Sequence, residues 1–152
     1  MNNLTIYQVN KLFYSATIPK IITKILKTKK KILLFCHDKY EMEYFDNLLW
    51  TFSQLSFIPH AVENDQFDID LQDVLITIDI NAQLFQDKHL IFLSHVLLSK
   101  IKLSINNDVF VIVKDVGEFD IQKLPNSVLL SRSVKYFKQS NDCSWSSVAL
   151  SS

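Results

Sequence analysis

Glycine is almost missing from this sequence. Gly117 is the one glycine among 152 residues, where average usage predicts about ten. The glycine-rich turns that hold nucleotide phosphates, GxGxxG and GxxxxGK[ST], need several backbone positions without a Cβ atom. The sequence therefore excludes the standard phosphate-binding loops before any fold is considered.

Cysteine and arginine are also scarce. Cys36 and Cys143 have no spacing that indicates a metal site or a disulfide framework, and Cys36 lies in an apolar run typical of a buried thiol. Arg132 is the only arginine. The first ten residues lack the order of a signal peptide, and no apolar run is long enough to span a bilayer. We expect a cytoplasmic protein that binds no metal and no cofactor.

The charges cancel overall but are segregated along the chain. Sixteen basic residues balance sixteen acidic ones. Residues 1–39 carry eight lysines and one acid, whereas residues 61–87 carry seven acids and no basic residue. Two interpretations remain open: solvated faces whose charges happen to cluster, or a surface of two signs that orients a charged partner.

Apolar runs alternate with amphipathic stretches along the whole chain. The continuous apolar runs and the β-prone segments predict strands over 4–9, 31–36, 73–79, 89–94 and 109–116, with a final edge strand over 143–150. Helical periodicity predicts helices over 13–28, 39–52, 96–103 and 124–140, and the acidic segment 61–72 is expected to be a loop. This alternation indicates an α/β fold over 1–152: a single domain with a mostly parallel twisted sheet flanked by helices, Rossmann-like in topology but without a Gly-rich loop.

A cysteine and a histidine stand together where a central strand is expected to end. Cys36 and His37 precede Asp38, and the carboxyl edge of an open α/β sheet is where sites form. A Cys/His pair can act as nucleophile and base. However, adjacent side chains on an extended chain point to opposite faces. A buried thiol and an N-cap aspartate explain the same residues.

Two other groups of residues each allow a structural and a functional interpretation. Aromatic and apolar side chains gather between 48 and 60, where they either close one end of the core or form an interface patch: Trp50, Phe57, Ile58 and Pro59. In the predicted helix over 124–140, Arg132, Lys135 and Lys138 recur at i, i+3 and i+6 near Tyr136. That stripe is either a solvated face or a basic groove for an acidic peptide or phosphates.

The segment KKILLFCHDKYEMEYFDNLLWTFSQLSFIPHA resembles the chi subunit family of bacterial DNA polymerase III. The family pattern LWxxxxxxFxPH is matched by Leu49, Trp50, Phe57, Pro59 and His60. The likeness follows most of the chain in order, is specific over 31–62 and is weak after 95.

The resemblance implies a non-catalytic accessory subunit for DNA replication; any polymerase activity belongs to the holoenzyme. Such proteins link the clamp loader, through the psi subunit, to the acidic, Phe-terminated tail of single-stranded DNA-binding protein. Some members bind a helicase in place of psi, and DNA is reached only indirectly. Two alternatives stay open: a small α/β hydrolase or thiol enzyme using Cys36 and His37, or a domain that binds single-stranded nucleic acid directly.

The resemblance also implies two binding surfaces. The psi-like or helicase face includes the matched phenylalanine and its neighbours: Trp50, Phe57, Ile58 and Pro59. The tail site lies on the basic and aromatic residues near the C-terminus and on an apolar residue after the penultimate strand: Val116, Arg132, Lys135, Tyr136 and Lys138. Lysines attract the acids of the tail, and an apolar slot takes its terminal ring.

Overall fold

The computed structural model describes residues 3–28, 30–51, 60–62, 73–78, 88–93, 108–115, 124 and 133–148. Within these ranges the strands are β1 (Asn3–Asn10), β2 (Lys31–Phe35), β3 (His60–Val62), β4 (Val74–Thr77), β5 (Lys88–Phe92), β6 (Val109–Asp115), β7 (Ser133–Gln139) and β8 (Trp145–Ser147). The helical elements there are a 3-10 turn, η1 (Lys11–Phe13), and two α-helices, α1 (Tyr14–Leu26) and α2 (Lys39–Thr51).

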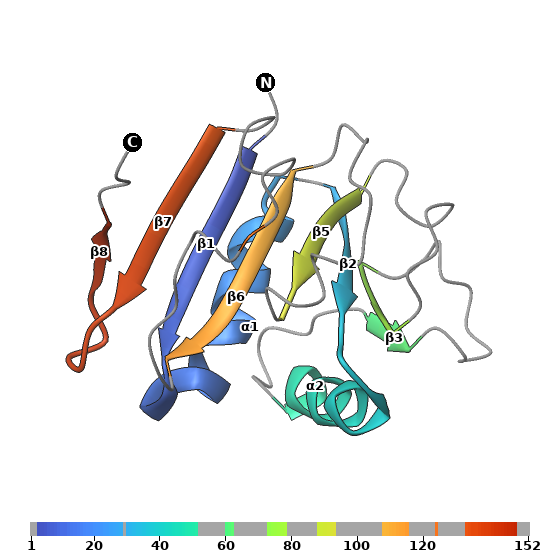
Figure 1. Cartoon of the computed structure of the whole chain (residues 1–152). Coiled ribbons are helices and arrows are strands. Elements are labelled where there is room, and N and C mark those ends of the chain that lie inside the picture. The colour runs from blue at the N-terminus through green and yellow to red at the C-terminus, as the bar shows by residue number, and fades with distance from the viewer. Residues whose placement is uncertain are drawn as a thin grey trace.

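All the described strands join one sheet in the order β3-β4-β2-β5-β6-β1-β7-β8 (Figure 1). Every pairing is parallel except that of β7 with β8, which is antiparallel and forms one edge. Parallel neighbours need crossover connections, which α1 and α2 provide after β1 and β2. The expected α/β fold with a mostly parallel sheet is confirmed.

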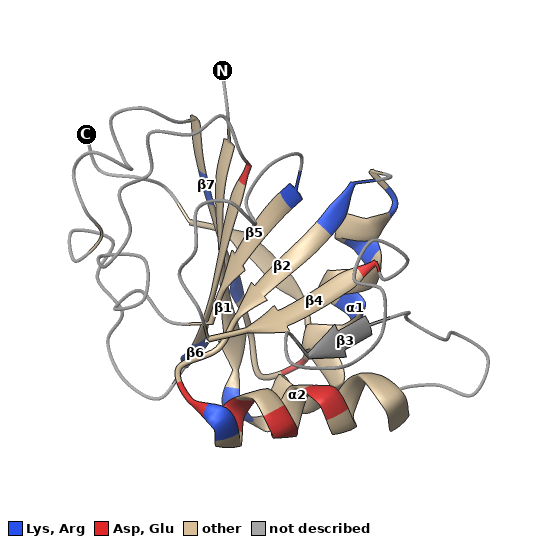
Figure 2. Ribbon diagram, turned by 90° about the vertical axis from the view of Figure 1, so that its right-hand side faces the viewer, with Lys and Arg blue, Asp and Glu red and all other residues tan. Residues whose placement is uncertain are grey.

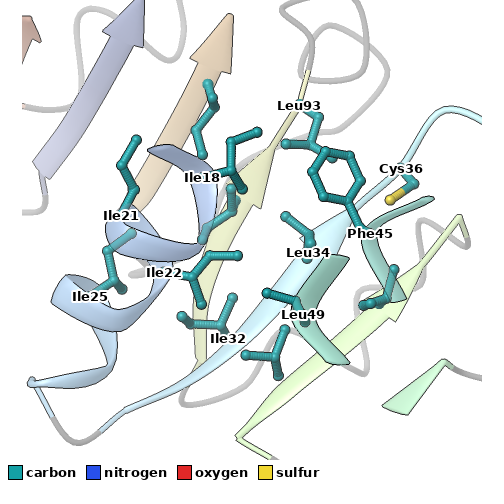
Figure 3. Packing of buried hydrophobic residues seen from close by; sticks show 14 of the residues in the cluster. Ile18, Ile21, Ile22, Ile25, Ile32, Leu34, Cys36, Phe45, Leu49 and Leu93 are labelled. Carbon is teal, nitrogen blue, oxygen red and sulfur yellow. The ribbon is translucent and has the colours of Figure 1, made fainter. Parts of the chain in front are cut away.

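Both α-helices pack on the same face of the sheet. Isoleucines recur along α1 at helical spacing, and Phe45 and Leu49 of α2 reach the same core. The sheet contributes alternate residues of β2, Ile32 and Leu34, as Figure 3 shows. Because successive side chains of a strand alternate between faces, Leu33 and Phe35 enter a second core on the opposite face.

The strand β7 replaces the helix that we predicted over 124–140. Residues 133–139 pair in parallel with β1, from Asn3↔Ser133 to Gln8↔Lys138, and at their end with β8. The segment SVKYFKQ contains a β-branched residue and two aromatics, which suit a half-buried strand. Its apolar residues also fit a short stretch of helical period, so the pattern alone did not separate the two structures. Hydrogen-bonded pairing with β1 on one side and β8 on the other favours the strand.

The other strand predictions that fall on described residues agree with the structure, including the edge strand β8 within 143–150. One strand was missed: β3 pairs with β4, and its residues 61 and 62 belong to the segment 61–72 that we expected to be a loop. Three residues are too short for a readable alternation. The predicted helix over 96–103 and residues 63–72 of the acidic loop lie outside the described residues.

Candidate binding surfaces

The Cys36–His37–Asp38 sequence directly precedes α2 and does not form a catalytic cluster. The Cys36 side chain is buried whereas that of His37 is exposed. Burial raises the pKa of the Cys36 thiol far above its usual value, and the nearby Glu41 carboxylate raises it further. Thiolate is the nucleophilic form of cysteine, so this thiol is an inert part of the core.

Two carboxylates cap the start of α2. The Glu41 N–H donates to Asp38 Oδ1 at 2.9 Å, and Glu41 Oε1 accepts the His37 N–H at 2.9 Å. The expectation that Asp38 caps this helix is confirmed. These bonds satisfy backbone donors that would otherwise attract an anion at the helix N-terminus.

The end of β1 is closed in a comparable way. The Asn10 side-chain oxygen accepts the Leu12 N–H at 2.9 Å, and its amide donates to Asn141 Oδ1 at 2.8 Å. This junction between first strand and first helix is where doubly wound proteins place their Gly-rich phosphate loop. Here an asparagine network takes its place, in agreement with the scarcity of glycine.

Of the residues predicted for the psi-like face, the structure describes Trp50. It stands near the end of α2 with 54% of its surface exposed. A single exposed aromatic side chain is compatible with a surface role but does not by itself form an apolar patch. Phe57, Ile58 and Pro59 lie outside the described residues, while His60 begins β3 beside β4.

The residues predicted for the tail site are arranged by a strand and not by a helix. Lys135 and Lys138 are exposed, and strand alternation directs them to opposite faces of β7. Tyr136 is buried, with its hydroxyl bonded to Gln8. The predicted helical stripe of three cations is therefore wrong. Arg132 and Val116 lie outside the described residues.

The sequence reasoning missed a cavity between α1 and the strands β1, β7 and β8. It has a volume of about 320 Å³ and is lined by three aromatic rings, those of Tyr7, Phe137 and Trp145. The Tyr7 ring stacks on Phe137 at 5.8 Å between centroids and meets Trp145 edge-on at 5.6 Å. Lys20 and Lys24 of α1 border the same cavity. Their spacing of four residues was the available signal, but their position opposite β7 depends on the fold.

A buried hydrogen-bond network forms the polar side of this cavity. The Gln139 amide nitrogen donates to Thr17 Oγ1 at 3.2 Å and to Cys143 Sγ at 3.3 Å. Its oxygen accepts the Asn10 N–H at 3.1 Å. Cys143 has a positive φ of 70°, which lets the chain turn tightly from β7 into β8. The polar groups under the aromatic rings are thus already paired within the protein.

A second cavity of about 530 Å³ lies at the carboxyl ends of β2, β5 and β6, beside Tyr14, Tyr40 and Glu41. Lys114 extends over the Tyr14 ring, 4.8 Å from its centroid. Burial raises the pKa of the Glu41 carboxyl. The cavity therefore combines tyrosine rings with charges of both signs.

Neither α-helix in the described ranges is long and apolar enough to cross a membrane. In the same ranges, no group of three or more histidine, cysteine or acidic side chains is placed to hold a metal ion.

Comparison with known proteins places the chain in a family. The family model described as "DNA polymerase III chi subunit, HolC" matches residues 1–120. No curated protein and no solved structure matches the chain significantly. The family match includes β1 to β6 and both helices, and it ends before β7. This chain therefore belongs to the DNA polymerase III chi subunit family, whose members are accessory subunits of the replicative polymerase.

Proposed function

We propose that the protein is a non-catalytic, cytoplasmic accessory subunit that links the clamp loader of DNA polymerase III to single-stranded DNA-binding protein. The observation that carries the proposal is the family match over residues 1–120. The inert Cys36 thiol supports a binding role over the alternative of a thiol enzyme. In this role the subunit contacts other proteins and reaches DNA through them.

The psi-like or helicase face is proposed to centre on Trp50, together with Phe57, Ile58 and Pro59. Exposed aromatic side chains are the usual anchors of protein interfaces because they bury much area at low entropic cost. Trp50 supports this assignment, since its exposed indole stands near the end of α2, just ahead of the other three residues in sequence. The partner is the psi subunit, another clamp-loader component, or a helicase.

The tail site is proposed to include Val116, Arg132, Lys135, Tyr136 and Lys138. Lys135 and Lys138 support it as exposed cations that can attract an acidic tail. Tyr136 acts indirectly, because its buried ring and its hydroxyl bond to Gln8 fix β7 beside β1. Because the two lysines occupy opposite faces of β7, a bound tail is expected to contact one of them directly. The other lysine would attract the tail only through long-range electrostatics.

Titration with the acidic C-terminal peptide of the cognate single-stranded DNA-binding protein tests the tail site. We expect a Kd of about micromolar, as is usual for a small exposed peptide site. Lys135→Glu should weaken binding several-fold by replacing attraction with repulsion. Lys39→Glu, the same change on an exposed lysine of α2, is the matched control. Absence of binding at high micromolar peptide, or equal binding by both variants, would contradict the tail site.

A further inference from the structure

We propose that the cavity between α1, β1, β7 and β8 binds an unpaired base of single-stranded nucleic acid, with the flanking phosphates on the lysines of α1. This goes beyond the proposed function, in which DNA is reached only through the single-stranded DNA-binding protein. The cavity combines an aromatic interior with a basic border, and both features come from elements that the fold brings together.

The basic border is a continuous row on one helix. Lys20, Lys24 and Lys27 recur at i, i+4 and i+7 in and just after α1, and all three are exposed. At 1.5 Å of rise per residue they are spaced by about 6 and 4.5 Å along the helix axis. A row of cations beside a groove is how proteins follow a nucleic-acid backbone. Lys20 and Lys24 border the cavity directly.

Within the part of the chain that the structure describes, no acidic residue lines the cavity. The first 37 residues, which supply α1 and β1, contain no aspartate or glutamate. Asp142 lies in the turn next to Cys143, where hydrogen bonds from Ser140 and Ser144 hold its pKa at about 2. Its carboxylate is thus engaged within its own turn. Among the described residues, the two border lysines outweigh the charge of Asp142 and favour an anionic ligand.

The aromatic interior offers a stacking surface. Trp145 is 40% exposed at the mouth of the cavity and is held edge-on by Tyr7. Tyr7 is in turn stacked on Phe137. Such an arrangement holds the rings in fixed orientations, so a base can stack on the exposed indole without reorganisation. Stacking of this kind is tolerant of sequence because every base has a π face.

The paired polar groups favour a nucleotide over a peptide. Peptide sites usually supply main-chain hydrogen bonds or a cluster of free N–H groups for a terminal carboxylate. In this cavity the Gln139 amide and the Thr17 hydroxyl are bonded to each other, and Gln139 also bonds Asn10 and Cys143. Recognition is left to stacking and charge, which are the two interactions that hold a single strand without reading its sequence.

Fluorescence anisotropy of a labelled oligothymidine of about ten nucleotides, a length within the usual site size, tests the proposal on the full chain. We expect weak, saturable binding. The logarithm of the binding constant should fall with the logarithm of the salt concentration at a slope of about −1.4 to −2, since two or three lysines contact phosphates. Lys24→Glu should lower the affinity several-fold and make the salt slope less steep, as expected for the loss of about one phosphate contact. Trp145→Leu should lower affinity without changing the slope. Lys39→Glu, on α2, should do neither.

Three results would overturn the proposal. These are no binding of the oligonucleotide at low salt, an equal loss of affinity in the Lys24→Glu and Lys39→Glu variants, or undiminished affinity in the Trp145→Leu variant. Urea unfolding of each variant verifies that the fold is kept. An unlabelled acidic peptide that displaces the oligonucleotide would assign the cavity to the tail instead. Lys138 lies on the face of β7 opposite to the cavity. Lys138→Glu should therefore weaken binding of the tail and leave binding of the oligonucleotide unchanged. Failure of the tail site can thus be distinguished from failure of the nucleic-acid site.

Discussion

His89 is a buried histidine with an incomplete set of hydrogen bonds. The ring is 3% exposed, and its Nε2 lies 2.8 Å from the Thr28 hydroxyl. Its Nδ1 atom has no hydrogen-bond partner among the residues that the structure describes. Phe110 meets the ring edge-on at 5.5 Å. A neutral imidazole fits this apolar setting, whereas an imidazolium would lack solvation.

The protein is therefore expected to lose stability as the pH falls below about 6.5. Burial lowers the pKa of folded His89, so the unfolded chain, with a histidine pKa of about 6.5, binds more protons in that interval. The free energy of unfolding should fall from pH 7 towards the folded-state pKa and change little with this group above pH 7. Urea unfolding at pH 7.5 and 5.5 measures the difference.

A His89→Gln variant provides the control for this pH effect. Glutamine keeps a polar group of similar reach but does not titrate, so the variant should show a smaller stability difference between the two pH values. An equal pH dependence in the parent and in His89→Gln would argue that other groups are responsible.

At the scale of elements, α2 has one side that builds the core and another that is open to a partner. Phe45 and Leu49 are buried in the core, each 1% exposed, whereas Trp50 directly follows Leu49 and is 54% exposed. One helical position thus separates a residue that stabilises the fold from one proposed to bind. A helix of 3.6 residues per turn points neighbouring side chains about 100° apart, which accounts for the contrast.

Substitution of these two neighbours should separate stability from binding. Leu49→Ala should lower the free energy of unfolding by about 2–5 kcal/mol, because it leaves a cavity in the core. Trp50→Ala should lower it by less than Leu49→Ala does, because 54% of the Trp50 surface is exposed, while removing binding of the psi-like partner. Urea unfolding and co-purification with the partner measure the two effects. A large loss of stability in Trp50→Ala would indicate that the indole is mainly structural.

The elements also show what could be predicted from the sequence. β2 was predictable because KILLF is continuously apolar, as a strand buried on both faces must be. β7 was not, because it becomes a strand through pairing with β1, about 130 residues away in sequence. The same pairing determines which side chains of β7 lie together at the candidate sites. It places Lys135 and Lys138 on opposite faces and brings Phe137 next to Tyr7, a juxtaposition that no local pattern contains.

At the scale of the whole molecule, zero net charge results from separate basic and acidic regions. Acidic residues recur along α2, and basic residues gather where α1 ends and β2 begins (Figure 2). The sequence predicted the basic region within residues 1–39, whereas the acidic segment that it singled out, 61–87, lies mostly outside the described residues. The structure adds that the basic residues of α1 border an aromatic cavity while the acidic ones accompany the exposed Trp50. The proposed nucleic-acid site and the proposed psi-like face thus lie in regions of opposite charge.

The tail site and the psi-like face are expected to respond differently to salt. Binding of an acidic tail by lysines is electrostatic, so raising NaCl from about 50 to 500 mM should weaken it strongly, because exposed charges are screened within a few ångströms at high salt. Binding at Trp50 rests on buried apolar area, which added NaCl does not screen. Calorimetric titrations of both partners at the two salt concentrations test this. Parallel salt slopes would mean that both partners depend on the same lysines, and that the molecule cannot hold them at independent surfaces.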